Sequence, residues 1–293
     1  MSLSALALVL LAGMIHAYWN FAAKKAGGDA RFATFSGLVM LLAWAPVGIW
    51  LGLEELPHWG RDQWLLLCGG GVVHTLYFVT LLRGYRKADL TVVYPLARGS
   101  GPLLSSLVAL LLLNEQLSAF GIVGIVGVVG GVFLIAGGPK LWRASKDPAQ
   151  HQRMHKGIVY GLLTGGLIAC YTVVDGYAVK LLLMSPALTH YLTNCVRFGF
   201  LLPSVLRDIP AAAVLWKQQW KYAVVVGIMS PVSYVLVLYA MQTAPLSHVA
   251  PMREVSMLFA ALLGGHLLGE GERRVRLLGA AFIGSGVIAL ALG

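Results

Sequence analysis

Two stretches of this chain match each other: Ala88-Asp-Leu-Thr-Val-Val-Tyr-Pro-Leu-Ala-Arg98 and, with one residue fewer, Ala244-Pro-Leu-Ser-His-Val-Ala-Pro-Met-Arg253. Two further pairs keep the same order, since Leu113-Asn-Glu115 matches Leu268-Gly-Glu270 and Asn20…Lys25 matches Asp175…Lys180. Most of the paired residues are 155 positions apart. Because several independent anchors share this offset, we predict that the chain contains two copies of one structural unit.

The composition is that of a membrane protein. Hydrophobic residues make up 58% of the 293 residues and charged residues only 12%, and the mean hydropathy is +0.77. A soluble protein cannot hide that much apolar surface, because its exterior must face water. The net charge of +10 comes from basic residues between long apolar runs, as is typical of residues that flank membrane spans. These features exclude a cytosolic globular enzyme, a disordered chain and a nucleic-acid binder.

Ten apolar segments fit this chain length, since one helical span needs about 20 residues. Helices are expected because each span must satisfy its own backbone hydrogen bonds in hydrocarbon. The most polar linker divides the chain into a first five-helix repeat at 1–139, a cytoplasmic linker at 140–156 and a second repeat at 157–293. The predicted spans are 2–23, 32–53, 63–82, 90–113, 118–138, 157–179, 186–206, 220–241, 246–268 and 275–292.

Basic residues predict the orientation of the spans. Seventeen Lys and Arg residues lie in the odd-numbered loops, and two lie in the even-numbered loops. Because cytoplasmic loops carry the excess of Lys and Arg, both termini are expected on the periplasmic side of a bacterial inner membrane. Five spans per repeat is an odd number, so the repeats must enter the membrane in opposite directions. The predicted fold is therefore an all-α membrane protein with ten transmembrane helices, arranged as two inverted five-helix repeats around a central cavity.

With these features the sequence resembles the drug/metabolite transporter superfamily, in its EamA-type group of ten-span transporters. The matching residues are His16-Ala-Tyr-Trp-Asn20, Lys24, Pro95, Glu115 and Gly124 in the first repeat, and Pro251, Gly269-Glu270, Gly279 and Gly286 in the second. The resemblance implies a helical bundle whose cavity faces first one side of the membrane and then the other. It does not choose a substrate, because relatives carry amino acids, other metabolites, nucleotide sugars or toxic organic molecules.

Arg98 and Arg253 are predicted to lie inside the bilayer, where a charge costs a few kcal/mol. Their places in the fourth and ninth spans put one guanidinium on each side of the midplane. One hypothesis is that both bind an anionic group of the substrate, since a guanidinium suits carboxylate or phosphate. The alternative is a structural ion pair between helices. Irregular helix is expected at both arginines because proline and glycine lie close by: Pro95, Gly99, Gly101, Pro102 and Pro251.

Glu254 and Asp175 are the carboxylates expected to act inside the spans. Glu254 follows Arg253 directly, and adjacent residues on a helix point about 100° apart, so these two do not face each other. Glu254 therefore needs another partner, which is a cation, the amine of a substrate, Arg197 or a proton. Burial lets a carboxylate carry protons, so Glu254 and Asp175 are candidates for proton coupling. A static pair of Glu254 with Arg197 is the alternative.

Aromatic and polar residues in mid-span complete the predicted site. Such side chains can form cavity walls that stack on a ring or a cation, although ordinary packing is the alternative for each of them. The candidates for substrate binding are Arg98, Arg253, Glu254, Tyr77, Tyr234, Tyr94, Trp19, Asn20 and His74.

No metal and no cofactor is expected. The histidines of the spans are scattered without i, i+3 or i+4 pairs, and the three cysteines lack metal-ligand spacing. Spans 5 and 10 carry glycines that permit close helix approach, favoured inside a monomer, with a dimer face as the alternative. These residues are Gly121, Gly124, Gly127, Gly130, Gly131, Gly279, Gly284 and Gly286.

The predicted function is secondary active transport of a small polar metabolite by alternating access, as an exporter or an exchanger. Two arginines and two carboxylates fit both ends of an amino acid or similar zwitterion. A carrier of an anionic or phosphorylated metabolite and multidrug efflux are the alternatives, and the expected partners are the substrate, the lipid bilayer and protons. The chain has no Walker motif, so ATP is not the direct energy source. A membrane-embedded enzyme would need a nucleophile with a base, or a metal cluster, and neither is visible. A scaffold would gain little from buried charges.

Overall fold

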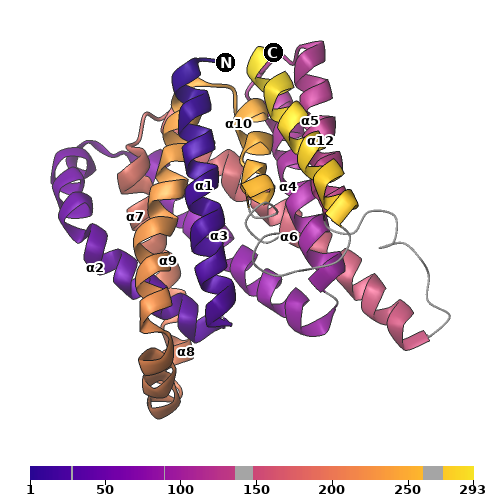
Figure 1. The fold of residues 1–293 in the computed structure, drawn as a ribbon. Helices are drawn as coiled ribbons and strands as arrows, with labels where there is room; N and C mark the ends of the chain where they lie inside the picture. Colours follow the sequence, from indigo (N-terminus) through magenta and orange to yellow (C-terminus); the bar gives the residue numbers. More distant parts are fainter. Residues whose placement is uncertain (28, 89, 136–147, 260–272) are drawn as a thin grey trace.

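The computed structural model describes residues 1–27, 29–88, 90–135, 148–259 and 273–293. These residues form a bundle of helices and contain no strand (Figure 1). Residues 255–259 are also helical. The helices are α1 (Leu3–Ala26), α2 (Ala30–Glu55), η1 (Leu56–His58), α3 (Arg61–Lys87), α4 (Leu90–Leu112), α5 (Ala119–Ile135), α6 (Pro148–Lys180), α7 (Pro186–Leu201), α8 (Pro203–Leu206), α9 (Ile209–Thr243), α10 (Leu246–Met252) and α12 (Arg273–Leu292).

The helices begin and end at polar or glycine residues between the apolar runs. Ser2 accepts a hydrogen bond from the N–H of Ala5 at 3.3 Å where α1 begins. Asp29 accepts one from the N–H of Phe32 at 3.0 Å where α2 begins. Side chains of this kind satisfy backbone donors that the first helical turn leaves open. At the other end of α1, Gly27 has a φ of 66°, in the left-handed region that favours glycine.

Six described helical segments are long and apolar enough to cross a membrane: α1, α2 with η1, α3, α4, α6 and α9. The helix α5 and the segment Leu277–Leu292 of α12 are apolar but shorter. The all-α architecture with membrane-spanning helices was expected from the hydropathy pattern, and it is confirmed.

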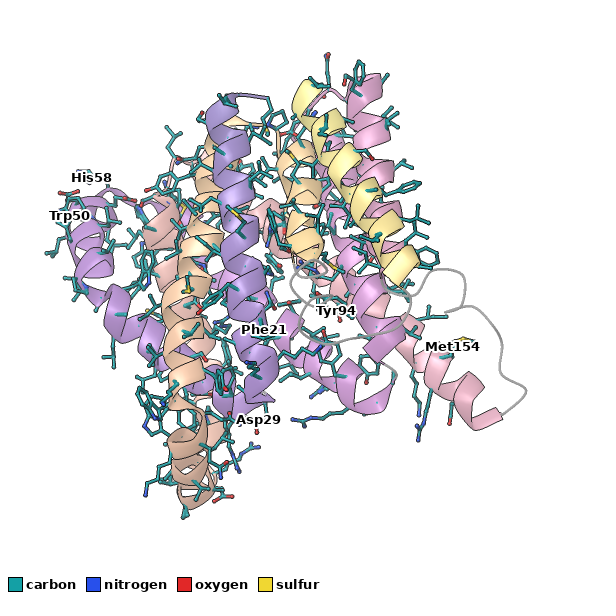
Figure 2. The ribbon with its side chains drawn as sticks, viewed as in Figure 1. Phe21, Asp29, Trp50, His58, Tyr94 and Met154 are labelled. Carbon is teal, nitrogen blue, oxygen red and sulfur yellow. The ribbon has the colours of Figure 1, made fainter. Side chains whose placement is uncertain are left out.

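Several predicted boundaries differ from the structure. The helix α9 begins at Ile209, whereas the eighth span was predicted to begin at residue 220. The helix α6 begins at Pro148, so part of the predicted linker is helix that continues into the predicted sixth span. Met154, in this extension, lies at the edge of the bundle (Figure 2). The predicted seventh span is divided into α7 and α8, because Pro203 has no N–H to continue the helical hydrogen bonds. Residues 140–147 of the linker and the stretch Leu268-Gly-Glu270 lie outside the described residues.

Helices from the two predicted repeats pack against each other. The helix α1 lies along α9, α4 lies along α6, and α5 lies along α12 (Figure 1). In each pair one helix comes from the first repeat and the other from the second. The largest apolar core joins α1, α9, α10 and α12 through side chains such as Val9, Leu238, Leu246 and Ile283. The two repeats therefore share one core.

Glycines bring α5 and α12 into close contact. A Cβ on Gly131 would lie 2.5 Å from the carbonyl oxygen of Gly279, and a Cβ on Gly279 would lie 2.8 Å from the carbonyl oxygen of Gly131. The same reciprocal relation joins Gly124 and Gly286, at 2.8 Å in both directions. At the offset of 155, Gly124 matches Gly279 and Gly131 matches Gly286, so each contact is a copy of the other, as in a two-fold interface. These glycines pack inside the chain, which was the favoured prediction.

Both termini lie at one end of the bundle, where the N-terminal ammonium donates a hydrogen bond to the carbonyl oxygen of Ala291 at 3.2 Å (Figure 1). Glu115, in the loop after α4, accepts hydrogen bonds from the N–H groups of Leu246 at 2.8 Å and Ser247 at 2.9 Å, where α10 begins. The ammonium of Lys180, at the end of α6, donates to the same carboxylate at 3.0 Å. A side chain of the first repeat thus caps a helix of the second.

Large apolar side chains cover the outside of the bundle. Trp50 is 59% exposed and Leu111 is 81% exposed. Figure 2 shows Trp50 on the outer side of α2, near the end of that helix that is opposite Asp29. A continuous apolar exterior is unfavourable in water and fits the hydrocarbon of a bilayer.

Candidate functional site

A small cavity lies between α1, α4, α9 and the segment that follows α10. Its volume is about 20 Å³, which is room for one water molecule. Three of the predicted binding residues line it together, namely Arg98, Tyr234 and Arg253. The structure therefore brings the two mid-span arginines, one from each repeat, to the same cavity.

One face of α1 and one face of α9 supply the remaining walls. The lining residues of these helices are spaced by three or four and so lie on one side of each helix. They are Val9, Ala12, Gly13 and His16 on α1, and Ser233, Tyr234 and Val237 on α9. Gly13 allows α1 to approach the segment after α10, because a Cβ at this position would overlap the side chain of Val255.

Arg98 and Glu254 form a buried ion pair between the repeats. The Nε atom of Arg98 lies 3.0 Å from Oε2 of Glu254, and Nη2 of Arg98 donates to Oγ of Ser256 at 3.2 Å. The Nε–H bond is not aligned with the carboxylate oxygen, so the contact is an ion pair without hydrogen-bond geometry. The predicted alternative, a pair of Glu254 with Arg197, is wrong. The carboxylate of Glu254 contacts Arg98 on α4 and not Arg197 on α7.

Arg253 has a different environment. Its guanidinium carbon lies 5.1 Å from the centre of the Tyr234 ring, a cation–π geometry. Its Nη1 donates to Oγ1 of Thr172 at 3.5 Å, which is long for a hydrogen bond. Within the part of the chain that the structure describes, no carboxylate pairs with Arg253. Its guanidinium therefore retains donors for a group that enters the cavity.

The backbone differs at the two arginines. Helix α10 ends at Met252, and residues 253–254 form a turn before the helical residues 255–259, so irregular helix at Arg253 is confirmed. Helix α4 is continuous through Arg98, so the irregular helix expected there is wrong. Gly101 instead serves packing, because a Cβ there would lie 2.7 Å from Cγ2 and 3.0 Å from Cβ of Ile168 on α6. This close contact with a neighbouring helix supports α4 where proline weakens it.

A second cluster of buried polar groups lies beside the cavity. Oδ2 of Asp175 on α6 lies 2.9 Å from Nε2 of His74 on α3, and it accepts a hydrogen bond from the Tyr234 hydroxyl at 2.6 Å. The His74 ring stacks on Tyr171, with ring centres 4.2 Å apart. Three predicted site residues thus meet from three helices. The described residues contain no group of three His, Cys, Asp or Glu side chains that could hold a metal ion.

Two predicted aromatic residues stand behind the cavity wall. Trp19 donates from Nε1 to Oγ of Ser233 at 3.1 Å, and its ring centre lies 4.7 Å from that of His16. Tyr77 meets Tyr171 edge to face, with ring centres 5.3 Å apart. Both aromatic side chains therefore contact residues of the cavity wall or of the polar cluster, and they position these residues.

Two other predicted residues lie apart from this arrangement. Asn20 donates from Nδ2 to the carbonyl oxygen of His16 on its own helix at 2.7 Å. Tyr94 is 37% exposed and is not among the residues that line the cavity. Their predicted roles in substrate binding rest on the sequence pattern alone.

Three residues of the site are missing from the predicted candidates for substrate binding: His16, Ser233 and Tyr171. Helical spacing contains a signal for two of them. His16 precedes Trp19 by three residues and Tyr171 precedes Asp175 by four, so each shares a helix face with a predicted residue. Ser233 carries no such signal, because a serine inside an apolar helix is common in any packed bundle.

Comparison with known proteins adds a family relationship. The model of the EamA-like transporter family matches the chain twice, over residues 3–137 and 155–292. A crystal structure of a protein that is 16% identical superposes with a TM-score of 0.76 and covers 100% of this chain and 98% of its own. At this identity the likeness concerns the fold alone. No curated protein matches the chain.

Proposed function

This chain belongs to the EamA-like transporter family, and from that premise we propose that it is a secondary active transporter of an amino acid or a similar zwitterion. The resemblance to the drug/metabolite transporter superfamily is confirmed by the family match in both repeats. Members of the family are membrane transporters of small molecules, not enzymes. The substrate class, the mode as exporter or exchanger, and the binding residues are the parts that we add.

The observation that carries the proposal is the unequal pairing of the two cavity arginines. Glu254 neutralises Arg98 at 3.0 Å, whereas no carboxylate of the described residues pairs with Arg253. These three groups leave one positive charge at the cavity. A guanidinium presents parallel N–H donors that match a carboxylate, so Arg253 is the group that binds the acidic end of the substrate.

The other end of a zwitterion finds a partner beside the cavity, where Glu254 contacts the lining residue Arg98. Oε2 of Glu254 has no hydrogen-bond partner among the described residues, and an ammonium group supplies one. The aromatic side chain of Tyr234 adds a face that attracts cations. A substrate with one carboxylate and one ammonium therefore satisfies Arg253 and Glu254 together.

Alternating access requires two related halves and a cavity that opens. The reciprocal contacts of α5 and α12 support two inverted five-helix repeats, 1–139 and 157–293, because antiparallel fifth helices related by a two-fold axis come from oppositely inserted halves. With a volume of about 20 Å³, the cavity is too small for an amino acid. Helices that line it must move apart before the substrate enters, which fits a carrier more closely than an open channel.

The membrane orientation that we propose rests on charge. Both termini lie at one end of the bundle, as an even number of spans such as ten requires. The excess of Lys and Arg in the odd-numbered loops favours the opposite end as the cytoplasmic one. The proposed location is therefore a bacterial inner membrane with periplasmic termini, and the monomer is the proposed transporting unit.

Thermal stabilisation of the purified protein tests the proposal. We expect a proteinogenic L-amino acid to raise the melting temperature of the wild type by several degrees, because a ligand stabilises by mass action. Arg253→Gln should lower affinity at least tenfold through the loss of charge-assisted hydrogen bonds. Arg207→Gln, at an exposed arginine, is the matched control and should bind like the wild type. Equal affinity in Arg253→Gln and the wild type would contradict the proposal.

An anionic metabolite is the second candidate, because the cavity carries an excess positive charge. Amino acid methyl esters, which lack the carboxylate, and glycerol 3-phosphate, which lacks the ammonium, separate the two. A zwitterion carrier is stabilised by neither as strongly as by the parent amino acid. Stabilisation by glycerol 3-phosphate alone would favour the anionic substrate instead.

A further inference from the structure

One oxygen of Asp175 has two buried partners. His74 Nε2 lies 2.9 Å from Oδ2, and the Tyr234 hydroxyl donates to the same atom at 2.6 Å. The residues His74 and Asp175 are 8% and 4% exposed. A histidine and a carboxylate at this distance hold either one or two protons between the imidazole and the carboxyl group, so the pair is neutral or carries one negative charge.

Tyr234 connects this pair to the cavity. Its hydroxyl contacts Asp175, while its ring lies 5.1 Å from the guanidinium carbon of Arg253 and lines the cavity. A single aromatic side chain therefore separates the charge that faces the substrate from the charge of the buried pair. At this short range, and in a medium of low dielectric constant, the two charges act on each other.

A substrate in the cavity changes the relative free energies of the negative and the neutral state of the His74–Asp175 pair. With the cavity empty, the positive charge of Arg253 stabilises the negative state of the pair, in which a proton has left. A substrate carboxylate bound to Arg253 cancels the charge that stacks on Tyr234, while Glu254 neutralises the substrate ammonium, so the neutral, protonated state of the pair becomes favourable. By linkage, a proton on the pair in turn favours binding of the carboxylate.

The groups around the His74–Asp175 pair do not reverse the direction of this coupling between protonation and carboxylate binding. Tyr171 stacks on His74, and His190 of α7 lies 5.0 Å from the Tyr234 ring, measured between ring centres. Tyr77 of α3 contacts Tyr171 edge to face. These groups are neutral in their ordinary states near pH 7. The remaining charged groups nearby are Arg197 on α7, whose charge is constant, and the ion pair of Arg98 with Glu254.

We propose that His74 and Asp175 form a proton site that is loaded together with the substrate carboxylate, so that a proton and the substrate move in the same direction. This inference rests on the proposed function, because Arg253 must be the group that binds the carboxylate. Glu254 is not the proton carrier, since its protonation would leave Arg98 buried without a counter-ion. The direction of net movement follows the gradients, so an outward substrate gradient takes protons out with it.

Proton uptake on ligand binding tests the inference. The full chain, purified in weakly buffered detergent with a pH indicator, receives a mixture of the proteinogenic L-amino acids or a mixture of their methyl esters. We expect the amino acids, and not the esters, to cause uptake of about one proton per molecule bound. Affinity should be roughly tenfold higher at about pH 6 than at about pH 8.

Two variants separate the proton site from the substrate site. Asp175→Asn and His74→Gln should still bind amino acids, but without proton uptake and with little dependence on pH. Uptake of the wild-type size in both variants overturns the inference, and so does binding to the wild type without uptake or with proton release. Thermal stabilisation measures substrate binding separately from proton uptake. A negative result for proton uptake therefore leaves the proposed function intact.

A measurement without ligand tests the proton site by itself. It is needed if no amino acid binds, a result that would contradict the proposed function but would not test His74 and Asp175. In ¹⁵N-histidine-labelled protein, the resonance that is lost in His74→Gln reports the imidazole of this pair. It should shift in Asp175→Asn, because the variant removes the carboxylate that lies 2.9 Å from Nε2. A His74 resonance at the same position in Asp175→Asn and in the wild type overturns the pair and, with it, the proton site.

Discussion

Arg98 and Arg253 occupy matching positions in the two repeats, yet their surroundings differ. Arg98 lies on a continuous helix and pairs with Glu254, whereas Arg253 lies at a break after α10 and stacks on Tyr234. The difference begins in the sequence, since the residue after Arg98 is Gly99 and the residue after Arg253 is Glu254. One carboxylate added to one repeat neutralises the arginine of the other.

The polar cluster repeats this asymmetry. Asn20 of the first repeat hydrogen-bonds its own helix, while its match in the second repeat, Asp175, joins His74 and Tyr234. Both carboxylates of the site thus come from the second repeat. Contacts that require only small residues, such as those of Gly131 with Gly279, remain symmetric. We infer that duplication supplied the scaffold and that unequal charges specialised its centre.

The largest expected effect comes from breaking the ion pair of Arg98. In Glu254→Gln the buried guanidinium loses its counter-ion, and the free energy of unfolding should fall by about 3–5 kcal/mol. Arg253→Gln should cost only about 1 kcal/mol, since it removes a cation–π contact and a long hydrogen bond. Thermal unfolding of the purified protein measures both.

A double variant controls for the ion pair. Arg98→Met combined with Glu254→Leu removes both charges and should regain most of the stability that is lost in Glu254→Gln. Equal losses in Glu254→Gln and Arg253→Gln would show that the two arginines are paired alike, contrary to the comparison.

The contact between α5 and α12 is symmetric, so matching substitutions on the two helices should destabilise the protein equally. Gly131→Ala and Gly279→Ala each place a Cβ within 2.8 Å of a carbonyl oxygen of the facing helix. Each should therefore lower the free energy of unfolding by about 1–3 kcal/mol. The matched control is Gly130→Ala, whose Cβ would come no closer than 3.9 Å to Phe282 and should be tolerated. A large effect on one side only would argue against the two-fold relation.

The smallest expected effect concerns Glu115 at the end of the bundle. Burial alone would raise the pKa of Glu115, but hydrogen bonds from Ser247, Leu246 and Lys180 outweigh it and hold the pKa below its ordinary value. A carboxyl group with a lowered pKa stabilises the folded state above its ordinary pKa and loses this contribution as the pH falls through the lowered value.

Glu115→Gln should accordingly lower the stability at pH 7 by about 1–2 kcal/mol. The difference from the wild type should shrink below about pH 4, where the wild-type carboxylate also becomes protonated. Melting temperatures measured across this pH range check the prediction, with the exposed Glu54→Gln as control. A difference that stays constant down to acidic pH would mean that the charge of Glu115 does not contribute.

Much of the fold followed from patterns along the chain. Apolar runs predicted the helices, and the glycines of spans 5 and 10 predicted close helix packing inside the monomer. Mid-span placement was enough to select Arg98, Arg253, Asp175 and His74. It was not enough to select Ser233, whose importance comes from its contact with Trp19 across two helices. It also left the partner of Glu254 undecided between several groups.

The sequence by itself determined that this chain is a duplicated membrane protein with charged residues inside its apolar segments, because hydropathy, basic loops and repeat spacing are properties of the chain in one dimension. Only the tertiary structure decided that Glu254 belongs to Arg98, that Arg253 faces the cavity over Tyr234, and that Tyr234 reaches Asp175. Such contacts depend on how helices that are distant in sequence approach and rotate against each other, and the spacing of residues along the chain does not determine that packing.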